Sequence, residues 1–338
     1  MNKYHTIIAG AGPAGLACAA ILAKSGRRVL VLERNNRVGP KVCAGGITWA
    51  GISGRIPNDL IEKSFPDQHV STVWQKTIIS EDVPLVSTVN REALGNWMLD
   101  RALDAGAEVR VSSPLTDISG DSLKSGTDSF HFQYLVGADG STSCVRRQLA
   151  IPVSSAGAGI NYFIPGDYPA MHWHLDDRLF NNGYAWIFPH NGQASVGAYA
   201  CRSSLPPALL KKNFHIWAEK HGINLEQSRL TSALVNYDFR GWRFGNRFLV
   251  GDAAGLASAL TGEGIYPAIV SGEEAARTII DPGHDNIVMD KLLARHHLHR
   301  RIAAITAKNK VACRMTMEFL VMALRLKIIP FKVLEMAS

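Results

Sequence analysis

The chain has 338 residues, of which 46% are hydrophobic and 19% are charged, and this balance excludes an intrinsically disordered protein. Its five scattered cysteines include no CxxC pair, which argues against a disulfide framework or a zinc site and favours a reducing, cytoplasmic location. The net charge of +7 is carried by residues 290–338, where ten Lys and Arg accompany three acids.

The first predicted elements are a strand, a glycine-rich turn and a helix. An apolar strand at residues 6–9 runs into the turn, a helix covers residues 16–24, and a second strand at residues 28–32 ends before an acid. In such a fingerprint the glycines allow a tight turn, a close approach of backbone to a pyrophosphate, and close packing of helix on strand. The helix N-terminus offers N–H donors to phosphates, and the acid can accept hydrogen bonds from an adenosine ribose. The predicted dinucleotide site comprises Gly10, Gly12, Pro13, Ala14, Gly15, Glu33 and Arg34.

A lone cysteine lies in the sequence KVCAGG at residues 41–46. Cys43 has no neighbour in sequence that could form a disulfide or complete a metal site with it. It is either a group that faces a ligand or a small residue packed beneath a loop, since free cysteines are often buried. Gly45 and Gly46 would let the backbone approach a ligand closely, and Lys41 either steadies a charge there or is solvated.

Two more strand-end turns follow the same pattern as the first. One apolar strand ends at Gly137-Ala138-Asp139-Gly140 and precedes a short helix, and another ends at Gly251-Asp252. A loop after the latter leads to Thr261-Gly262-Glu263-Gly264, where a long helix of small residues starts. Single turns of this kind are common, but three in order indicate one extended ligand held at several points. Arg91 lies at the start of a predicted helix, where the pattern alone is typical of a residue on a solvated face.

The middle of the chain predicts an antiparallel sheet. Four short segments between residues 159 and 200 are rich in aromatic and branched residues, and Asn191-Gly192 between the last two is typical of a hairpin turn. Tyr184, Trp186 and Phe188 alternate along one strand and therefore share a face. A helix is predicted at residues 206–221. His172 and His174 have a spacing that could bind metal, but no third ligand is evident, so we interpret them as structural and expect no metal.

The C-terminal region, residues 287–336, is predicted to be helical and is both apolar and basic. Glu318 and Arg325 interrupt its apolar stretch, which makes it too short and too charged to span a bilayer. It either lies on a membrane surface or caps the second lobe with a charged outer face. We therefore expect a cytoplasmic protein, with peripheral membrane contact left open.

The patterns together predict an α/β protein. Its parts would be a Rossmann-like domain of residues 1–150 and 240–282, an antiparallel-sheet substrate domain of residues 151–239 and C-terminal helices at 283–338. Residues 60–90 could add to the substrate domain.

The three turn motifs, in this order, resemble the FAD-binding fold of the p-hydroxybenzoate hydroxylase-like flavoproteins. The resemblance implies FAD as the cofactor, with Asp139 near its nucleotide end, Asp252 at its ribityl chain and Arg91 near the flavin. The turn before residue 265 would place a helix N-terminus beside the isoalloxazine, where the helix dipole favours negative charge on a reduced flavin. The further cofactor contacts that we expect are Lys41, Ala44, Gly45, Gly251, Gly262, Glu263, Gly264 and Ile265.

The sequences KxCxGG, YxWxFP and TGEGI together resemble the geranylgeranyl reductase family, flavoenzymes that saturate isoprenoid double bonds. The likeness covers residues 1 to about 276, although Ser258-Ala259 stands where family members tend to carry Asn-Pro. It implies an FAD-dependent reductase that saturates carbon–carbon double bonds of a polyprenyl lipid. The flavin would supply a hydride, and Cys43 or Tyr184 would supply or relay a proton. The expected substrate contacts are Gly46, Tyr184, Trp186, Phe188 and Pro189.

Two alternatives remain at this stage. One is a flavin-dependent monooxygenase or halogenase of the same fold; halogenases carry a WxWxIP stretch, from which YAWIFP departs at the first and fifth positions. The other is a non-catalytic, membrane-associated flavoprotein. The expected partners of the leading hypothesis are a hydrophobic isoprenoid, an electron donor that is NAD(P)H or a small redox protein, and no nucleic acid.

Overall fold

The N-terminal strand β1 (Asn2–Ala9) lies in the middle of a sheet ordered β17-β18-β11-β1-β2-β8, with the β9–β10 hairpin beside β11. In the computed structural model, which describes residues 2–226 and 228–337, β1 pairs in parallel with β2 and with β11. The VLVL sequence of β2 is buried along its whole length, as expected for a parallel strand covered on both faces. The other strands are β2 (Val29–Leu32), β8 (Glu108–Arg110), β9 (Leu115–Ser119), β10 (Ser122–Ser125), β11 (Asp128–Gly137), β17 (Arg243–Phe244) and β18 (Arg247–Leu249).

The register of this sheet brings the three predicted turn motifs together. Ala9, at the end of β1, pairs with Leu32 on one side and with Gly137 on the other. Gly137 in turn pairs with Leu249, at the end of β18. The turns that follow these four residues therefore begin at one edge of the sheet, where ligands of open α/β sheets bind.

Helices cover both faces of this sheet. The helix predicted at residues 16–24 begins three residues earlier, as α1 (Pro13–Lys24), because proline fits the first position of a helix. α8 (Ile265–Ile280) packs against it so closely that a Cβ at Gly272 would lie 2.1 Å from the carbonyl oxygen of Ala14. The remaining helices of this lobe are α3 (Arg91–Asp104), α4 (Cys144–Gln148), α7 (Gly251–Ala254) and the short η2 (Gly140–Thr142).

The second lobe contains a sheet ordered β16-β12-β15-β14-β13-β5-β6. β14 (Tyr184–His190) and β15 (Gln193–Cys201) form an antiparallel hairpin around Asn191-Gly192, which confirms the predicted turn. The predicted helix at residues 206–221 is confirmed as α6 (Pro207–Lys220). Other elements are β5 (Asp67–Ser71), β6 (Lys76–Ser80), β12 (Ala156–Pro165), β13 (Met171–His174), α5 (Asp177–Phe180) and β16 (Thr231–Asn236).

Residues 60–90 divide between two sheets. β5 and β6 extend the sheet of the second lobe, where β5 runs parallel to β13. The flanking strands instead form a three-stranded sheet ordered β3-β7-β4, which contacts β14. This small sheet, with two short helices, consists of β3 (Gly46–Thr48), α2 (Trp49–Ile52), η1 (Asn58–Leu60), β4 (Ile61–Phe65) and β7 (Val86–Val89).

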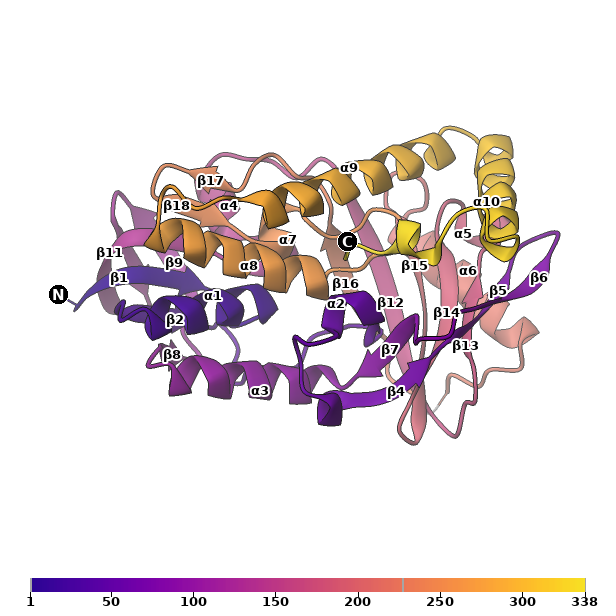
Figure 1. Cartoon of the computed structure of the whole chain (residues 1–338), viewed down its shortest axis with the longest axis horizontal. Coiled ribbons are helices and arrows are strands. Elements are labelled where there is room, and N and C mark those ends of the chain that lie inside the picture. The colour runs from indigo at the N-terminus through magenta and orange to yellow at the C-terminus, as the bar shows by residue number, and fades with distance from the viewer. Residues whose placement is uncertain (1, 227, 338) are drawn as a thin grey trace.

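The C-terminal region is helical, as predicted, and consists of α9 (Ile287–Ala307), α10 (Lys310–Arg325) and the short η3 (Phe331–Leu334). The break between α9 and α10 follows from Asn309, whose side chain accepts a hydrogen bond from the backbone N–H of Ala312 at 2.7 Å and caps α10. Figure 1 shows the first sheet at the end that carries the N-terminus, the second sheet at the opposite end, and α9 leading from α8 toward α10. Among the described residues, no helix has both the length and the hydropathy that a bilayer crossing requires.

Candidate functional site

A continuous cavity of about 920 Å³ extends from the aligned turns of the first sheet into the second lobe. We call its two parts the polar end and the apolar chamber. The polar end is lined by the turns after β1, β2, β11 and β18. The apolar chamber is lined by side chains of β5, β6, β13, β14, α10 and η3. All the predicted site residues line this cavity except Gly15, Gly45 and Pro189.

The three glycines of the fingerprint have different surroundings. Gly10 has a positive φ of 103°, and a Cβ there would lie 2.5 Å from the carbonyl oxygen of Ala138. A Cβ at Gly15 would lie 2.0 Å from the carbonyl oxygen of Gly10. At Gly12, by contrast, a Cβ would meet no described atom within 4 Å, and the residue faces the cavity. Gly10 and Gly15 are therefore required by the protein itself, whereas Gly12 leaves space for a ligand.

The N-terminus of α1 is free to hold an anion. Gly12 precedes this helix and, lacking a side chain, offers its first-turn N–H groups no capping acceptor. Pro13 has no N–H, so the donors that point out of the first turn belong to the residues after it. Together with the helix dipole, such donors favour a phosphate at this position.

Glu33 is buried at the end of β2, and both of its carboxylate oxygens accept hydrogen bonds from the protein. Its Oε2 accepts a hydrogen bond from the N–H of Ala11 at 2.9 Å. Its Oε1 accepts from the backbone and the side chain of Asn35, at 2.9 and 2.7 Å. A carboxylate has about four acceptor positions, so capacity for a ligand hydroxyl remains. Arg34 follows as an exposed residue that lines the same end of the cavity.

Two charged side chains at the cavity have buried atoms without partners among the described residues. They are the Nε and Nη1 atoms of Arg91 and the Oδ1 atom of Asp139. The other oxygen of Asp139 accepts from the N–H of Cys144 at 2.7 Å and so helps to begin α4. A buried polar atom without a hydrogen-bond partner destabilises the folded protein. These atoms therefore fit a polar ligand that would form hydrogen bonds with them. The side chain of Arg91 as a whole is partly exposed, so its placement toward a ligand stays a prediction.

Asp252 ties the cysteine loop to the turn after β11. Its Oδ2 pairs with the ammonium of Lys41 at 3.2 Å and accepts from the hydroxyl of Ser141 at 3.1 Å. Lys41 is half-exposed, so this ion pair contributes little stability, but it connects residues 41–46 to the polar end. Both members of the pair line the cavity.

The cysteine loop lies between the cores of the two lobes. Cys43 packs on the core of the first lobe, Ala44 on that of the second, and the N–H of Gly45 donates to the Cys43 Sγ at 3.3 Å. A Cβ at Gly45 would meet the ring of His190, and one at Gly46 would lie 2.8 Å from the Phe188 ring. Gly45 thus accommodates a protein side chain of β14, whereas Gly46 accommodates the Phe188 ring and also lines the cavity.

His190 contacts the backbone of this loop, a feature that the sequence analysis missed. The buried imidazole contacts the carboxylate of Glu62 through Nδ1 and the carbonyl oxygen of Ala44 through Nε2, at 3.0 Å for the latter. These two contacts connect β14 and β4 to the backbone of the cysteine loop. The only sequence signal is the position of His190 directly after YxWxFP.

Glu263, in the turn before α8, carries a carboxyl with a shifted pKa. Its oxygens accept from the hydroxyl of Thr48 at 3.1 Å and from the N–H of Met336 at 3.2 Å. Burial raises its pKa to about 7, although these two donors act in the opposite direction. A carboxyl that is about half protonated near neutral pH therefore lies on the cavity wall.

Tyr184, Trp186 and Phe188 of β14 all face the cavity. The hydroxyl of Tyr184 donates to the carbonyl oxygen of Thr261 at 2.5 Å, and burial, with Glu263 and Cys43 nearby, raises its pKa. The phenol is therefore neutral. Pro189 does not line the cavity, and its carbonyl oxygen accepts a hydrogen bond from the hydroxyl of Thr88.

Several walls of the apolar chamber were missed in the sequence analysis. The inner face of α10 contributes Met317, Leu320, Val321 and Leu324, and η3 contributes Phe331. Val70, Ile79 and Trp173 come from β5, β6 and β13. The signal was the amphipathic spacing within residues 310–325, which the sequence analysis assigned to a cap or a membrane face.

His172 and His174 lie two apart on β13, with ring centroids 6.0 Å apart. Burial, with His221 and His172 nearby, lowers the pKa of His174 to about 3, so this ring is neutral. Residues 2–226 and 228–337 contain no group of three or more His, Cys, Asp or Glu side chains that could hold a metal ion.

Comparisons with known proteins agree with this geometry. Residues 3–163 match the family described as an FAD binding domain. An uncharacterized protein of Methanosarcina barkeri is 31% identical over 82% of this chain and 75% of its own length. A geranylgeranyl diphosphate reductase of Rhodobacter capsulatus is 28% identical over 81% of this chain and 74% of its own length. Among solved structures, a geranylgeranyl bacteriochlorophyll reductase-like protein of Thermoplasma acidophilum is similar with a TM-score of 0.80 and 22% identity, over 96% of this chain and 92% of that one.

Proposed function

We propose that this chain, which belongs to the geranylgeranyl reductase family of FAD-dependent oxidoreductases, saturates carbon–carbon double bonds of a polyprenyl lipid or isoprenoid side chain. The family membership confirms the predicted fold class, the cofactor FAD and the oxidoreductase class. The substrate and the residues that act on it are our proposals.

The continuity of the cavity carries the proposal. One end is polar and carries glycine turns and unpartnered charged atoms, and the other is walled by aromatic and aliphatic side chains. A cofactor in the polar end would meet, without leaving the protein, an apolar molecule in the chamber. Long apolar chains with isolated double bonds suit a chamber of this composition, because burial of each methylene contributes about 0.8 kcal/mol.

The polar end fits FAD. We assign the pyrophosphate to the N-terminus of α1 beside Gly12, the adenosine ribose to Glu33, and the flavin region to Arg91 and Asp252. Reduced FAD would supply a hydride to one alkene carbon. The buried atoms of Arg91 and Asp139 would then gain the partners that they lack among the protein's described residues.

The second alkene carbon needs a proton, and Cys43 is our first candidate to provide it. Its thiol is half-buried at the cavity wall between the two lobes. Transfer would leave a thiolate, which takes a proton again from water or from the Glu263 carboxyl. Tyr184 is the second candidate, although its hydroxyl already donates to Thr261. The electron donor would be NAD(P)H or a small redox protein, since the one dinucleotide fingerprint of the sequence is assigned to FAD.

An anaerobic turnover experiment tests the function. The FAD-loaded protein is reduced with dithionite and mixed with geranylgeranyl diphosphate, while flavin absorbance and product masses are recorded. We expect the flavin to reoxidise and products to become heavier in steps of two hydrogens. Reoxidation only after air enters, with oxygen consumed, would favour the monooxygenase or halogenase alternative, and retained FAD without turnover would favour a non-catalytic flavoprotein.

Two serine variants test the proton donor. Cys43→Ser should slow reoxidation by substrate by about 100-fold, the size typical of a lost general acid. Cys144→Ser is the matched control, because Cys144 is also half-buried at the cavity but lies at the polar end, and we expect its rate to stay near that of the parent. Equal rates for both variants and the parent would transfer the role to Tyr184, which Tyr184→Phe tests in the same way.

A further inference from the structure

We propose that the outer side of α10 and the tip of the β5–β6 hairpin form a surface that docks on an anionic lipid bilayer. We call it the docking face. The lipid identity of the substrate rests on the proposed function, whereas the docking itself does not. The docking face consists of Trp74, Ile78, Val311, Met315, Phe319, Met322, Leu326 and Ile328, all of them exposed.

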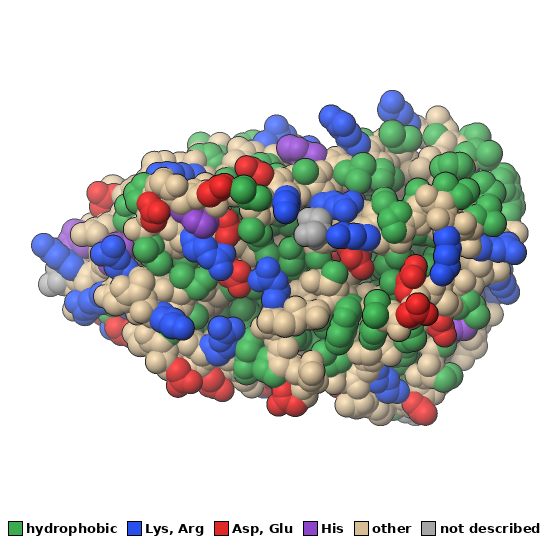
Figure 2. All heavy atoms as spheres, in the orientation of Figure 1, with side chains coloured by type: hydrophobic (Ala, Val, Ile, Leu, Met, Phe, Trp, Pro, Cys, Tyr) green, Lys and Arg blue, Asp and Glu red, His purple; other side chains and the backbone are tan. Residues whose placement is uncertain are grey.

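The outer side of α10 carries an apolar stripe. Val311, Met315, Phe319 and Met322 follow one another at steps of four, four and three residues, which places them on one side of the helix. Val311 is 73% exposed and Phe319 is 61% exposed. Figure 2 shows hydrophobic side chains gathered at the end of the molecule that carries α10. A contiguous apolar patch of this kind marks an interaction site.

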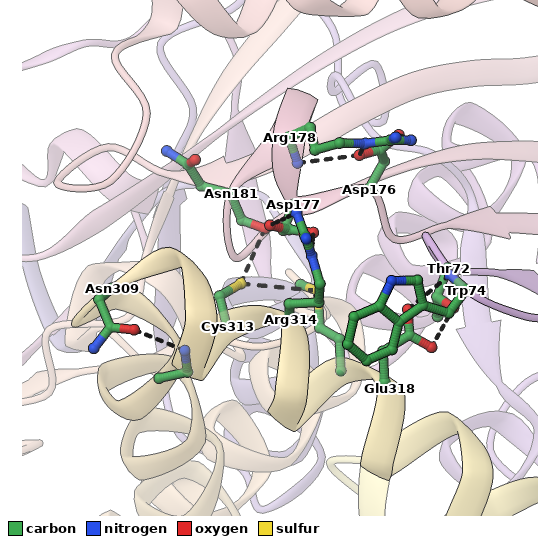
Figure 3. Close-up of polar contacts among 12 residues, drawn as sticks. Thr72, Trp74, Asp176, Asp177, Arg178, Asn181, Asn309, Cys313, Arg314 and Glu318 are labelled. Carbon is green, nitrogen blue, oxygen red and sulfur yellow. Dashed lines mark hydrogen bonds and ion pairs between the residues drawn. The ribbon is translucent and has the colours of Figure 1, made fainter.

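Polar contacts beside the stripe hold α10 in this orientation (Figure 3). The buried carboxylate of Glu318 accepts from the hydroxyl of Thr72 at 2.6 Å and from the N–H of Trp74 at 2.9 Å. Arg314 donates twice to the buried carboxylate of Asp177, at 3.0 and 3.1 Å. Rotation of the helix to bury its apolar stripe would break these charged contacts, so the exposure of the stripe is built into the fold.

The hairpin adds an aromatic side chain to the stripe. Trp74, 61% exposed, lies at the turn that Glu318 binds, and the Arg314 guanidinium lies 5.9 Å from its ring centroid. Ile78 follows on the exposed side of β6. Tryptophan is favoured at membrane–water interfaces because it combines an apolar ring with a polar N–H.

The charges around the docking face favour an anionic bilayer over a second copy of the chain. Between residues 291 and 337, all of them described, every exposed charged side chain is Lys or Arg, since Glu318 and Glu335 are buried. Lys308 and Lys310 flank one end of the stripe, and Arg325 and Lys327 flank the other. Self-association through this face would bring like charges together, whereas anionic headgroups would be attracted by them.

The same helix separates the docking face from the apolar chamber. Met317, Leu320, Val321 and Leu324 on its inner side line the cavity, while the stripe lies on its outer side. An α-helix with its side chains is about 10 Å thick, so a bilayer on the docking face would lie within one helix diameter of the chamber. A polyprenyl chain could then pass from the bilayer into the chamber along α10. An amphipathic helix that lies on a membrane without crossing it fits these features.

Vesicle flotation tests the docking. The FAD-loaded protein is mixed with vesicles of phosphatidylcholine alone or with phosphatidylglycerol added. We expect it to float with the anionic vesicles, and the double variant Met315→Glu/Phe319→Glu to float at least about tenfold less. The matched control is Leu209→Glu/Ile216→Glu, which places the same charges at exposed apolar positions of α6 and should float like the parent. FAD content and melting temperature show whether each variant folds.

A second variant separates charge from apolar contact. Lys308→Gln/Lys310→Gln should lower binding to the anionic vesicles about tenfold and leave any binding to phosphatidylcholine unchanged. The proposal is wrong if the parent does not float with anionic vesicles, or if the stripe double variant floats equally well. It is also wrong if size-exclusion chromatography shows a dimer that the stripe double variant dissociates and that does not bind vesicles.

The two proposals fail separately. Vesicle binding without alkene reduction would keep the docking face and reject the proposed function. Reduction of dissolved geranylgeranyl diphosphate by a protein that does not bind vesicles would support the proposed function and reject the docking face.

Discussion

The polar end and the apolar chamber of the cavity are built in different ways. At the polar end, backbone turns that follow aligned parallel strands surround the ligand space, and their geometry depends on glycines at fixed spacing. The chamber is built from side chains of strands, a hairpin and a C-terminal helix that are far apart in the sequence. A site made of backbone turns is therefore readable in sequence, whereas a side-chain chamber uses the same residue types as any core. Variants at each end can show whether the two ends are as independent as this difference suggests.

The largest effect is expected within the fingerprint itself. Gly15→Ala would force a Cβ to within 2.0 Å of the Gly10 carbonyl oxygen, and should lower the free energy of unfolding of the FAD-free protein by about 3 kcal/mol. Gly12→Ala meets no described protein atom, so it should leave that value unchanged and weaken FAD binding. Urea unfolding of the stripped proteins and FAD titration measure the two quantities. Equal destabilisation by both variants would contradict the separate roles.

The stability of the chamber wall formed by α10 should depend on the hydrogen bonds that Glu318 accepts from the β5–β6 turn. We call these hydrogen bonds the clamp. Glu318→Ala removes the acceptor of Thr72, Trp74 and Gln75 and should cost about 2–3 kcal/mol in unfolding free energy. Because the clamp lies outside the polar end, FAD content should stay at the parental level. Glu92→Ala, which breaks an exposed ion pair with Arg37, is the control and should cost less than about 0.5 kcal/mol. Loss of FAD in Glu318→Ala would show that the two ends are coupled.

Arg91 should contribute to cofactor binding without contributing to the stability of the FAD-free protein. Its buried Nε and Nη1 atoms have no partner among the described residues, so Arg91→Met loses no protein hydrogen bond at them. FAD affinity should fall by about tenfold to a hundredfold, which corresponds to about 1.5–3 kcal/mol for hydrogen bonds of a charged group. Arg101→Met, at an exposed position of the same helix, should leave the affinity unchanged. An FAD affinity of Arg91→Met equal to that of the parent would place the flavin away from α3.

Glu263 should make the free energy of unfolding depend on pH. Its pKa is raised to about 7 in the folded protein by burial, so between the unfolded value near 4.5 and about 7 the folded state binds more protons. The contribution of this residue to unfolding free energy is therefore present below pH 4.5 and is lost as the pH rises to about 7. Glu263→Gln should be more stable relative to the parent at pH 8 than at pH 5, by urea unfolding at both values. A difference that does not change with pH would mean that the carboxyl is ionised throughout.

Most of the residues that the sequence predicted for the cofactor line the cavity. Strand, turn and helix at residues 6–24 and the acid at Glu33 follow rules of local geometry, and the register of parallel strands then brings Gly10, Asp139 and Asp252 together. The predicted motif residues that do not line the cavity, Gly15 and Gly45, instead accommodate close protein neighbours. Local pattern cannot distinguish these two uses of glycine.

The chamber was predicted only in part, for a physical reason. The alternation of Tyr184, Trp186 and Phe188 showed a shared face, but which elements would cover it depends on long-range packing. The helix of residues 310–325 has two apolar sides, one toward the chamber and one toward solvent. The sequence alone does not show that Val321 is buried and Phe319 is exposed, because this depends on how the helix packs. The support of the cysteine loop by His190 and Glu62 joins residues 128 positions apart and leaves no local signal.

The measurement that most directly tests the central claim, one cavity shared by flavin and isoprenoid, is a difference absorption titration. Geranylgeraniol is added to the oxidised, FAD-loaded protein and to Val321→Phe, which narrows the chamber far from the polar end. We predict a saturable change of the flavin spectrum in the parent and an apparent affinity about tenfold weaker in the variant, with equal FAD content. A flavin spectrum that does not respond to the alcohol, or responds identically in both proteins, would contradict the claim.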